Sequence, residues 1–267
     1  GRSRFKLACL KADDFPTTDD IAATAELSVA AEVLSDIIKR TQFSMAQQDV
    51  RYFLNGLLLE IHNDHILSVA TDGHRLAKTQ VKVDPLGIEQ VQSIVPRKAV
   101  IEIGKFLDAN SEELVSLKLN SSHISIQSGH FLFISKLIDG RFPDYEKVIP
   151  ANLDKHVIIN RENLINILSR AAILSNEKFR GVSLSVDNNT LQVRSHNPDQ
   201  EHAKDEMEVA YAGEAIEIGF NVNYLLEALK ACESENIDLG LLDPNTSCTF
   251  HAEESADTLY LIMPMRL

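Results

Sequence analysis

Residues 131–150, FLFISKLIDGRFPDYEKVIP, are the stretch that decides the fold. Residues 131–135 alternate as a strand does, and Asp139-Gly140 then marks a turn. Pro143 and Pro150 enclose a short segment that cannot be helical, because proline lacks an amide donor and disfavours helix in the residue before it. The stretch therefore predicts the end of one domain followed by a linker.

The same signature occurs near both ends of the chain. Residues 2–16, RSRFKLACLKADDFP, alternate at Phe5, Leu7 and Cys9 and end on a proline. Residues 258–267, TLYLIMPMRL, form another strand pattern with nothing after it. Three strand endings, spaced by about one small domain, predict a tandem repeat that the chain enters late. We therefore expect most of a first domain to be missing.

Bulk composition describes a globular chain. It has 267 residues, of which 44% are hydrophobic, and length alone suggests two domains of ordinary size. It contains no apolar run of about 18 residues and no secretion signal, which predicts a cytoplasmic protein without a membrane partner. The three cysteines are not at metal-ligand spacing, so we expect reduced thiols and neither metal nor cofactor.

The net charge of −13 argues at first against a nucleic-acid partner. Its distribution weakens that argument. Helical apolar spacing predicts four helices, over 27–42, 97–108, 160–172 and 221–231. These segments carry slightly more Lys and Arg than Asp and Glu, so the acidic excess lies in strands and loops. The helices could therefore present DNA with a different surface from the rest of the molecule.

Short strands separated by turns fill the chain between these helices. The second half repeats the order of the first, with Gly56 and Gly181 opening equivalent strands at an offset of 125 residues. Each unit reads as helix, strands, helix, strands, without regular alternation of single strands and helices. This order predicts an α+β fold of tandem domains, each with two helices packed on antiparallel sheets.

Three short stretches are candidates for chemistry or binding. Asp72 and His74 in TDGHRLA could form a metal or acid-base pair, but a hairpin turn with Gly73 at positive φ explains the same residues. The chain-terminal MPMRL could wall a groove for several peptides or simply fill a core. The stretch QQDVRYF, residues 47–53, could contact phosphates and bases or begin a strand.

No phosphate loop, nucleophile elbow or Cys/His cluster appears in the sequence, which favours a protein that is not an enzyme. Two alternatives remain open. One is a small-molecule enzyme using Asp72 and His74. The other is a repeat-built interaction module that does not bind DNA.

Several longer strings resemble the bacterial beta sliding clamps, the processivity factors of the replicative polymerase, DNA polymerase III. They are TQFSMAQQDVRYFLNG, VATDGHRLA, SKLIDGRFPDY, AAILSNEKFRGV, EIGFNVNYLL and MPMRL. The resemblance runs from Arg2 to Leu267. It implies clamp domains that dimerise head to tail into a ring around duplex DNA, with helices lining the hole. Residues 1–20 would be the last strand and linker of a truncated first domain, 21–143 the middle domain and 144–267 the C-terminal domain.

The resemblance also implies a groove that binds linear motifs, roughly Gln-Leu-x-Leu-Phe, of polymerase, clamp-loader and repair proteins. Its residues would be Leu54, Thr71, Gly73, His74, Arg75, Leu76, Pro143, Lys147, Val148, Phe179, Asn221, Tyr224, Ser247, Leu261, Ile262, Met263, Pro264, Met265, Arg266 and Leu267. Lys147 departs from the arginine that the family pattern has at this place. The lysine ammonium group is a point charge, whereas the arginine guanidinium group is planar and can donate two parallel hydrogen bonds.

Two further sets follow from the resemblance. The residues implied to contact DNA, independently of its sequence, are Gln48, Arg51, Tyr52, Arg97 and Lys98. Those implied at the contact between two chains are Arg2, Arg4, Ile173, Leu174, Glu201 and Asp205, while Lys204 departs from the family's acidic pattern. Because most of a first domain is absent, we expect that this chain does not close a ring by itself.

Overall fold

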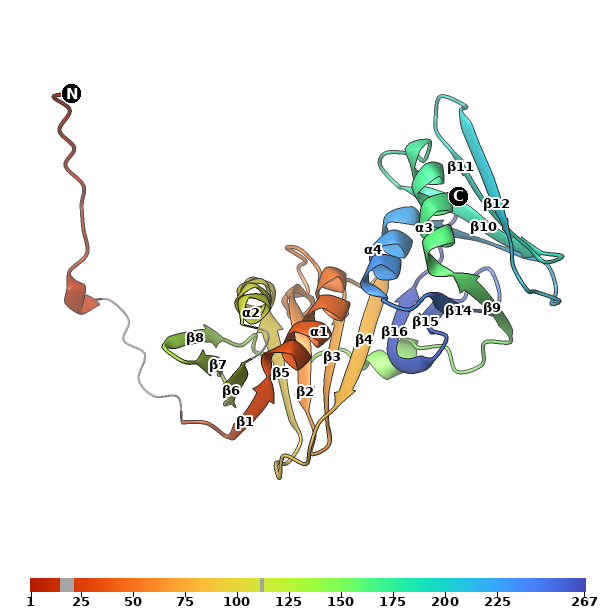
Figure 1. Ribbon diagram of the computed structural model, residues 1–267. Helices are drawn as coiled ribbons and strands as arrows, with labels where there is room; N and C mark the ends of the chain where they lie inside the picture. Colours follow the sequence, from red (N-terminus) through yellow and green to blue (C-terminus); the bar gives the residue numbers. More distant parts are fainter. Residues whose placement is uncertain (15–21, 111–112) are drawn as a thin grey trace.

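The computed structural model describes residues 1–14, 22–110 and 113–267. In this part of the chain two units of the same construction lie side by side, and residues 1–14 extend away from them (Figure 1). A short 3-10 helix, Ala12–Asp14, ends that N-terminal segment.

Each unit contains two helices and eight strands in the same order. The first unit comprises β1 (Ala25–Ala30), α1 (Ala31–Thr41), β2 (Gly56–Ile61), β3 (His65–Thr71), β4 (Arg75–Lys82), β5 (Val91–Pro96), α2 (Arg97–Ala109), β6 (Leu114–Leu119), β7 (His123–Ser128) and β8 (Phe131–Lys136). The second comprises β9 (Lys155–Asn160), α3 (Arg161–Ile173), β10 (Gly181–Asp187), β11 (Thr190–His196), β12 (His202–Glu208), β13 (Ile216–Asn221), α4 (Val222–Ala231), β14 (Asn236–Leu241), β15 (Cys248–Ala252) and β16 (Ser255–Ile262). The repeat inferred from the sequence and the α+β class are confirmed.

The two units share one sheet. Its eight strands run in the order β5-β2-β3-β4-β16-β15-β14-β9, so half of them come from each unit. The central pair is β4 with β16, antiparallel, with Thr258 opposite Thr79 and Ile262 opposite Arg75. The remaining strands form two four-stranded sheets, β1-β6-β7-β8 and β12-β11-β10-β13. One edge strand of each smaller sheet corresponds, in the repeat, to a central strand of the shared sheet. β8 occupies the position of β16, and β12 occupies the position of β4.

Apolar side chains form a core in each unit and a smaller cluster between them. In each unit the two helices pack on both sheets through residues such as Ile37 and Leu107, or Leu168 and Leu229. The small cluster joins β2, β3, β4 and β5 of the first unit with Leu261 of β16 and Phe142 of the connection. The segment read as a linker is therefore pinned at the junction, because Phe142 is buried there.

Several expected boundaries were wrong. The helix expected from residue 27 begins at Ala31, because residues 25–30 pair with β6. Residues 47–53, which could have begun a strand, do not: the strand begins at Gly56, after the 3-10 helix Tyr52–Asn55. The strand expected around Phe5, Leu7 and Cys9 does not form, since no described strand lies beside that segment to complete a ladder.

Asn160 caps α3, its side chain accepting a hydrogen bond of 3.0 Å from the Asn163 amide, and Asn221 caps α4, accepting one of 2.9 Å from the Asn223 amide. No helix in the described ranges is long and apolar enough to cross a membrane. Within those ranges no cluster of three or more His, Cys, Asp or Glu is arranged to hold a metal ion.

Candidate functional site at the junction of the two units

The turn between β3 and β4 is built by its own polar side chains. Asp72 Oδ1 accepts hydrogen bonds from the amides of His74 (2.9 Å) and Arg75 (3.1 Å). Thr71 Oγ1 donates to the Arg75 carbonyl at 2.6 Å, and Gly73 has a φ of +88°. The Asp72 carboxylate is thus engaged in shaping the turn, which supports the hairpin interpretation over an acid-base pair.

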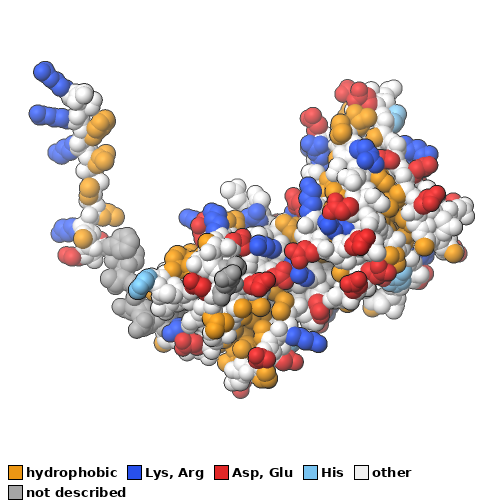
Figure 2. Space-filling view, in the orientation of Figure 1, with side chains coloured by type: hydrophobic (Ala, Val, Ile, Leu, Met, Phe, Trp, Pro, Cys, Tyr) orange, Lys and Arg blue, Asp and Glu red, His pale blue; other side chains and the backbone are white. Residues whose placement is uncertain are grey.

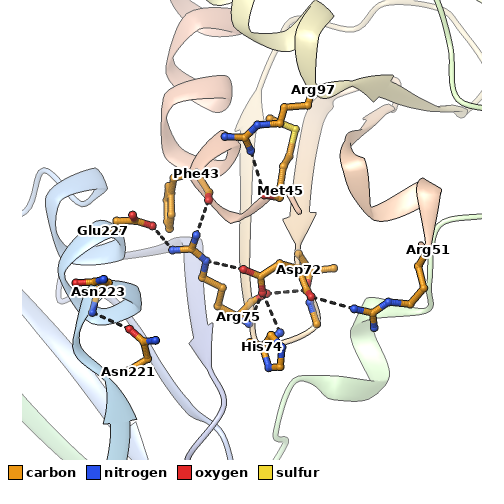
Figure 3. A network of polar contacts seen from close by, with 12 residues as sticks. Phe43, Met45, Arg51, Asp72, His74, Arg75, Arg97, Asn221, Asn223 and Glu227 are labelled. Atoms are coloured by element: carbon orange, nitrogen blue, oxygen red, sulfur yellow. Dashed lines mark hydrogen bonds and ion pairs between the residues drawn. The ribbon is translucent and has the colours of Figure 1, made fainter. Parts of the chain in front are cut away.

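Arg75 connects this turn to the second unit (Figure 3). Its Nε donates to Asp72 Oδ2 at 3.0 Å, one terminal nitrogen donates to Glu227 of α4, and the other donates to the Phe43 carbonyl at 2.8 Å. The guanidinium also lies over the Tyr224 ring, 4.5 Å from its centre. The Arg75 side chain is only 11% exposed, so its main role is to link the two units at the junction.

The C-terminal residues cross the junction after β16. The Met263 amide donates to the His74 carbonyl at 2.9 Å, and the Met265 amide donates to the Gly219 carbonyl on β13 at 2.8 Å. The tail is therefore held by the first unit at one point and by the second unit at the next.

A hollow of about 230 Å³ lies between the turn, the tail and the connection that follows Phe142. Most of its exposed lining is apolar, as in pockets that bind apolar side chains with a few polar anchors. Its lining residues are Arg51, Phe53, Leu54, Thr71, Gly73, Arg75, Leu76, Pro143, Asp144, Tyr145, Val148, Leu261 and Met263.

The predicted groove residues divide into two groups. Those that line the hollow are Leu54, Thr71, Gly73, Arg75, Leu76, Pro143, Val148, Leu261 and Met263. Those outside its lining are His74, Lys147, Phe179, Asn221, Tyr224, Ser247, Ile262, Pro264, Met265, Arg266 and Leu267.

Several residues of the second group contact one another or a residue of the lining. The His74 ring stacks on Tyr224 with 6.4 Å between ring centres. The Asn221 side chain donates to the Phe179 carbonyl at 3.4 Å. Lys147 points into solvent and pairs with Asp144 at 2.8 Å. This pairing lowers the pKa of the Asp144 carboxyl.

Four lining residues were not expected in the groove. Phe53, Asp144 and Tyr145 belong to the strings that resemble the clamp family, and Arg51 was expected to contact DNA. The proline at 143 signalled an ordered segment, but nothing local indicated that Asp144 and Tyr145 would face the same hollow as Arg51. Burial raises the pKa of the Tyr145 phenol to about 12.

Arg51 is held firmly at the rim. Its guanidinium bonds both oxygens of Asp49, at 3.0 and 2.8 Å, and the Asp72 carbonyl at 3.2 Å. These bonds lower the pKa of Asp49 to about 2. A Cβ added to Gly73 would lie 2.9 Å from the Arg51 side chain, so the glycine makes room for it.

The other residues expected to contact DNA lie nearby. Gln48 and Tyr52 are exposed on the loop before β2. Arg97 and Lys98 begin α2, where Arg97 donates to the Met45 carbonyl at 3.0 Å and Lys98 is exposed. All of them belong to the first unit.

The residues expected at a contact between two chains lie at the far end of the second unit and on the N-terminal segment. Ile173 ends α3 with its side chain 77% exposed, beside the half-buried Leu174, and Glu201 is exposed before β12. Asp205 on β12 accepts from Arg170 at 2.6 Å, which lowers its pKa. β12 is an edge strand among the described residues, with β11 as its partner.

The N-terminal segment has an unusual surface. Basic and apolar side chains alternate along it in Figure 2. Phe5 and Leu7 are more than four-fifths exposed, and Arg2 and Arg4 are exposed as well. Soluble proteins rarely leave such large apolar side chains in solvent next to one another, so this segment has the character of an unpaired strand.

Two family descriptions match the chain. One, "DNA polymerase III beta subunit, central domain", matches residues 28–144, and the other, "DNA polymerase III beta subunit, C-terminal domain", matches residues 146–266. The chain is 46% identical over 267 residues to the beta sliding clamp of Pseudomonas aeruginosa and 45% identical over 269 residues to that of Escherichia coli K12. In both comparisons all of this chain is matched, and it spans 72% of the relative.

Solved structures agree. A DNA polymerase sliding clamp from Pseudomonas aeruginosa with a ligand superposes with a TM-score of 0.93 at 45% identity, covering 100% of this chain and 73% of the other. A sliding clamp, DNA polymerase III subunit beta, from Bartonella birtlesii bound to griselimycin gives a TM-score of 0.91 at 34% identity, covering 98% of this chain and 72% of the other.

Proposed function

This chain belongs to the DNA polymerase III beta-subunit family, the bacterial sliding clamps, and we propose that the hollow at its junction is where partner proteins dock. As a sliding clamp it serves DNA replication by encircling duplex DNA and tethering the polymerase. The proposed partners are the replicative polymerase, the clamp loader and repair proteins, each docking through a short linear motif. We propose no catalytic role for the chain.

The observation that carries this proposal is the composition of the hollow. Its lining comes from both units: Leu54 and Leu76 belong to the first, and Leu261 and Met263 lie at the end of the second. Thr71 and Arg51 supply polar groups at its rim. An apolar hollow with a few polar anchors suits a peptide that inserts two apolar side chains and is oriented by its polar ones.

The direct test is a fluorescence-anisotropy titration with a labelled Gln-Leu-x-Leu-Phe peptide. We expect micromolar affinity, because the contact is small and the free peptide must be ordered on binding. Deletion of residues 265–267 should weaken binding strongly. A Lys118→Gln variant serves as the matched control, since Lys118 lies on β6 and pairs with Glu26, away from the hollow. Equal affinity for the chain and its truncated form would refute the assignment of the groove.

For DNA, we propose that Gln48, Arg51, Tyr52, Arg97 and Lys98 touch the duplex backbone within the ring. Contacts of this kind are weak and sensitive to salt. They are sufficient for a clamp, because the ring holds the duplex topologically and the protein must still slide.

For the ring contact, we propose that the N-terminal segment of one chain pairs with β12 of another. The support comes from the repeat. β4 pairs with β16 inside the chain, β12 is the counterpart of β4, and the residues around Phe5 and Leu7 have the alternation of β16. Arg2 and Arg4 would then lie near the acidic residues Glu201 and Asp205, with Ile173 and Leu174 covered.

We propose that Ile173 lies in this ring contact, where its side chain, 77% exposed in the single chain, would be covered. Analytical ultracentrifugation at micromolar concentration should report association that Ile173→Asp weakens, because burying a carboxylate in an apolar contact is costly. Equal association of the parent chain and the Ile173→Asp variant would contradict this proposal.

A further inference from the structure

We propose that Gly181 and Gly219 form a seat for the C-terminal tail and thereby position the wall of the peptide groove. This inference rests on the proposed function, but the seat lies outside the hollow, since neither glycine lines it. Both would act through the tail and would not touch a bound peptide.

The two glycines lie on one face of the β10–β13 pair. Gly181 is opposite Asn221, and Ser183 is opposite Gly219, so the glycines occupy neighbouring diagonal positions. This is the face turned away from the core, because Val182 and Phe220, the residue pair between them, are buried in the core. Gly181 is nevertheless buried, since the tail covers it.

The tail lies so close that a Cβ added to either glycine would overlap it. A Cβ on Gly219 would collide with the carbonyl oxygen of Met265 and lie 2.8 Å from Leu267 Cγ. A Cβ on Gly181 would collide with Leu267 Cδ2 and lie 3.6 Å from Met265 Cε. Neither glycine has a left-handed φ, so alanine suits the backbone at both positions and the only obstacle is the tail.

The seat is connected to the groove by a short piece of chain. The Met265 amide donates to the Gly219 carbonyl, and two residues earlier the Met263 amide donates to the His74 carbonyl. Met263 lines the hollow. If the tail leaves the two glycines, the Met265–Gly219 hydrogen bond is lost and the Met263–His74 hydrogen bond remains. Met263 is then held less firmly in the lining of the groove.

The two positions should respond to alanine in a definite order. At Gly219 the obstacle is a backbone oxygen, which cannot move unless the tail moves. At Gly181 the obstacle is the end of the Leu267 side chain, which can rotate away because Leu267 is 56% exposed. Gly219→Ala should therefore weaken peptide binding at least tenfold, and Gly181→Ala by less than threefold.

The test combines peptide affinity with a readout that needs no peptide. The probe is the labelled Gln-Leu-x-Leu-Phe peptide, and the second readout is hydrogen exchange of the Met265 amide followed by NMR. Gly219→Ala should speed that exchange at least tenfold, while circular dichroism and the thermal midpoint stay close to those of the parent chain. The matched control is Gly240→Ala, a strand glycine of the same unit whose Cβ would lie 2.7 Å from Leu153 Cδ1, away from the tail.

The outcomes separate the seat from the function. Faster Met265 exchange and weaker peptide binding in Gly219→Ala, with neither change in Gly240→Ala, would support the seat. Unchanged exchange in Gly219→Ala would overturn it, whatever the affinity. If the parent chain itself does not bind the peptide, the proposed function fails, while exchange still decides whether the tail is seated.

Discussion

Arg75 joins the two units and also lines the hollow at their junction. It hydrogen-bonds to the turn through Asp72, to the first unit through the Phe43 carbonyl and to α4 through Glu227. Lysine in its place would keep the charge but lose the planar fork that makes these bonds together.

We predict that Arg75→Lys weakens peptide binding about tenfold and couples energetically to Glu227→Gln. A double-mutant cycle in urea unfolding should give a coupling of about 1 kcal/mol, because the guanidinium is shielded while Glu227 is about half exposed. The control cycle uses Lys39 and Asp108, both about half exposed, where we expect a coupling near zero. Equal couplings in the two cycles would contradict the role given to Arg75.

The Asp49–Arg51 pair should be visible in a titration. Arg51 holds the pKa of Asp49 at about 2, below its value in the unfolded chain. Because the folded pKa is lowered, the pair contributes fully above about pH 4 and is lost as the pH falls toward 2. Carboxyl NMR should place the Asp49 titration near pH 2, and Arg51→Gln should move it upward. An unchanged Asp49 titration in that variant would show that another group holds the carboxylate.

At the scale of elements, the connection between the units is fixed by its apolar side chain. Phe142 is 5% exposed and packs in the cluster that contains Leu76 and Leu261. The same connection places Tyr145 and Val148 in the lining of the hollow. Its packing therefore stabilises the fold and positions part of the groove.

We predict that Phe142→Ala lowers the free energy of unfolding by about 3 to 5 kcal/mol, through lost burial and the cavity left behind. Phe131→Ala is the control. Phe131 is 40% exposed and stacks on Phe106 with ring centres 3.9 Å apart, so we expect a loss of only about 1 kcal/mol. Denaturant unfolding measures both. Similar losses would mean that Phe142 does not pin the connection.

At the scale of the whole molecule, the net charge of −13 and a role on DNA are compatible. Few basic residues are assigned to DNA. A closed ring retains the duplex by enclosing it, so tight contacts with the backbone are not needed. Binding of a short linear duplex should therefore be weak and strongly reduced by salt.

We predict that Lys98→Gln lowers the slope of log K against log salt by about 0.9, the contribution of one phosphate contact. Anisotropy of a labelled duplex between low and moderate salt measures this slope. Lys118→Gln is the control, because that lysine lies on β6 and already pairs with Glu26. Equal slopes for the parent chain and Lys98→Gln would remove Lys98 from the DNA surface.

Local sequence determined a large part of this structure. Apolar spacing predicted all four helices, and the offset between Gly56 and Gly181 predicted the repeat. The Asp72-Gly73 turn was also readable, because side chain-to-backbone bonds within a few residues build it. The family resemblance then indicated most of the residues that line the hollow.

Only the tertiary structure decided which distant segments meet. It paired β4 with β16 across the junction and turned residues 25–30 into a strand beside β6. It also brought Arg51 to the rim of the groove and placed the tail on Gly219. The physical reason is that alternation marks a segment as a strand without specifying its partner. Which edge it joins, and which side chains then share a hollow, depends on packing between residues far apart in the chain.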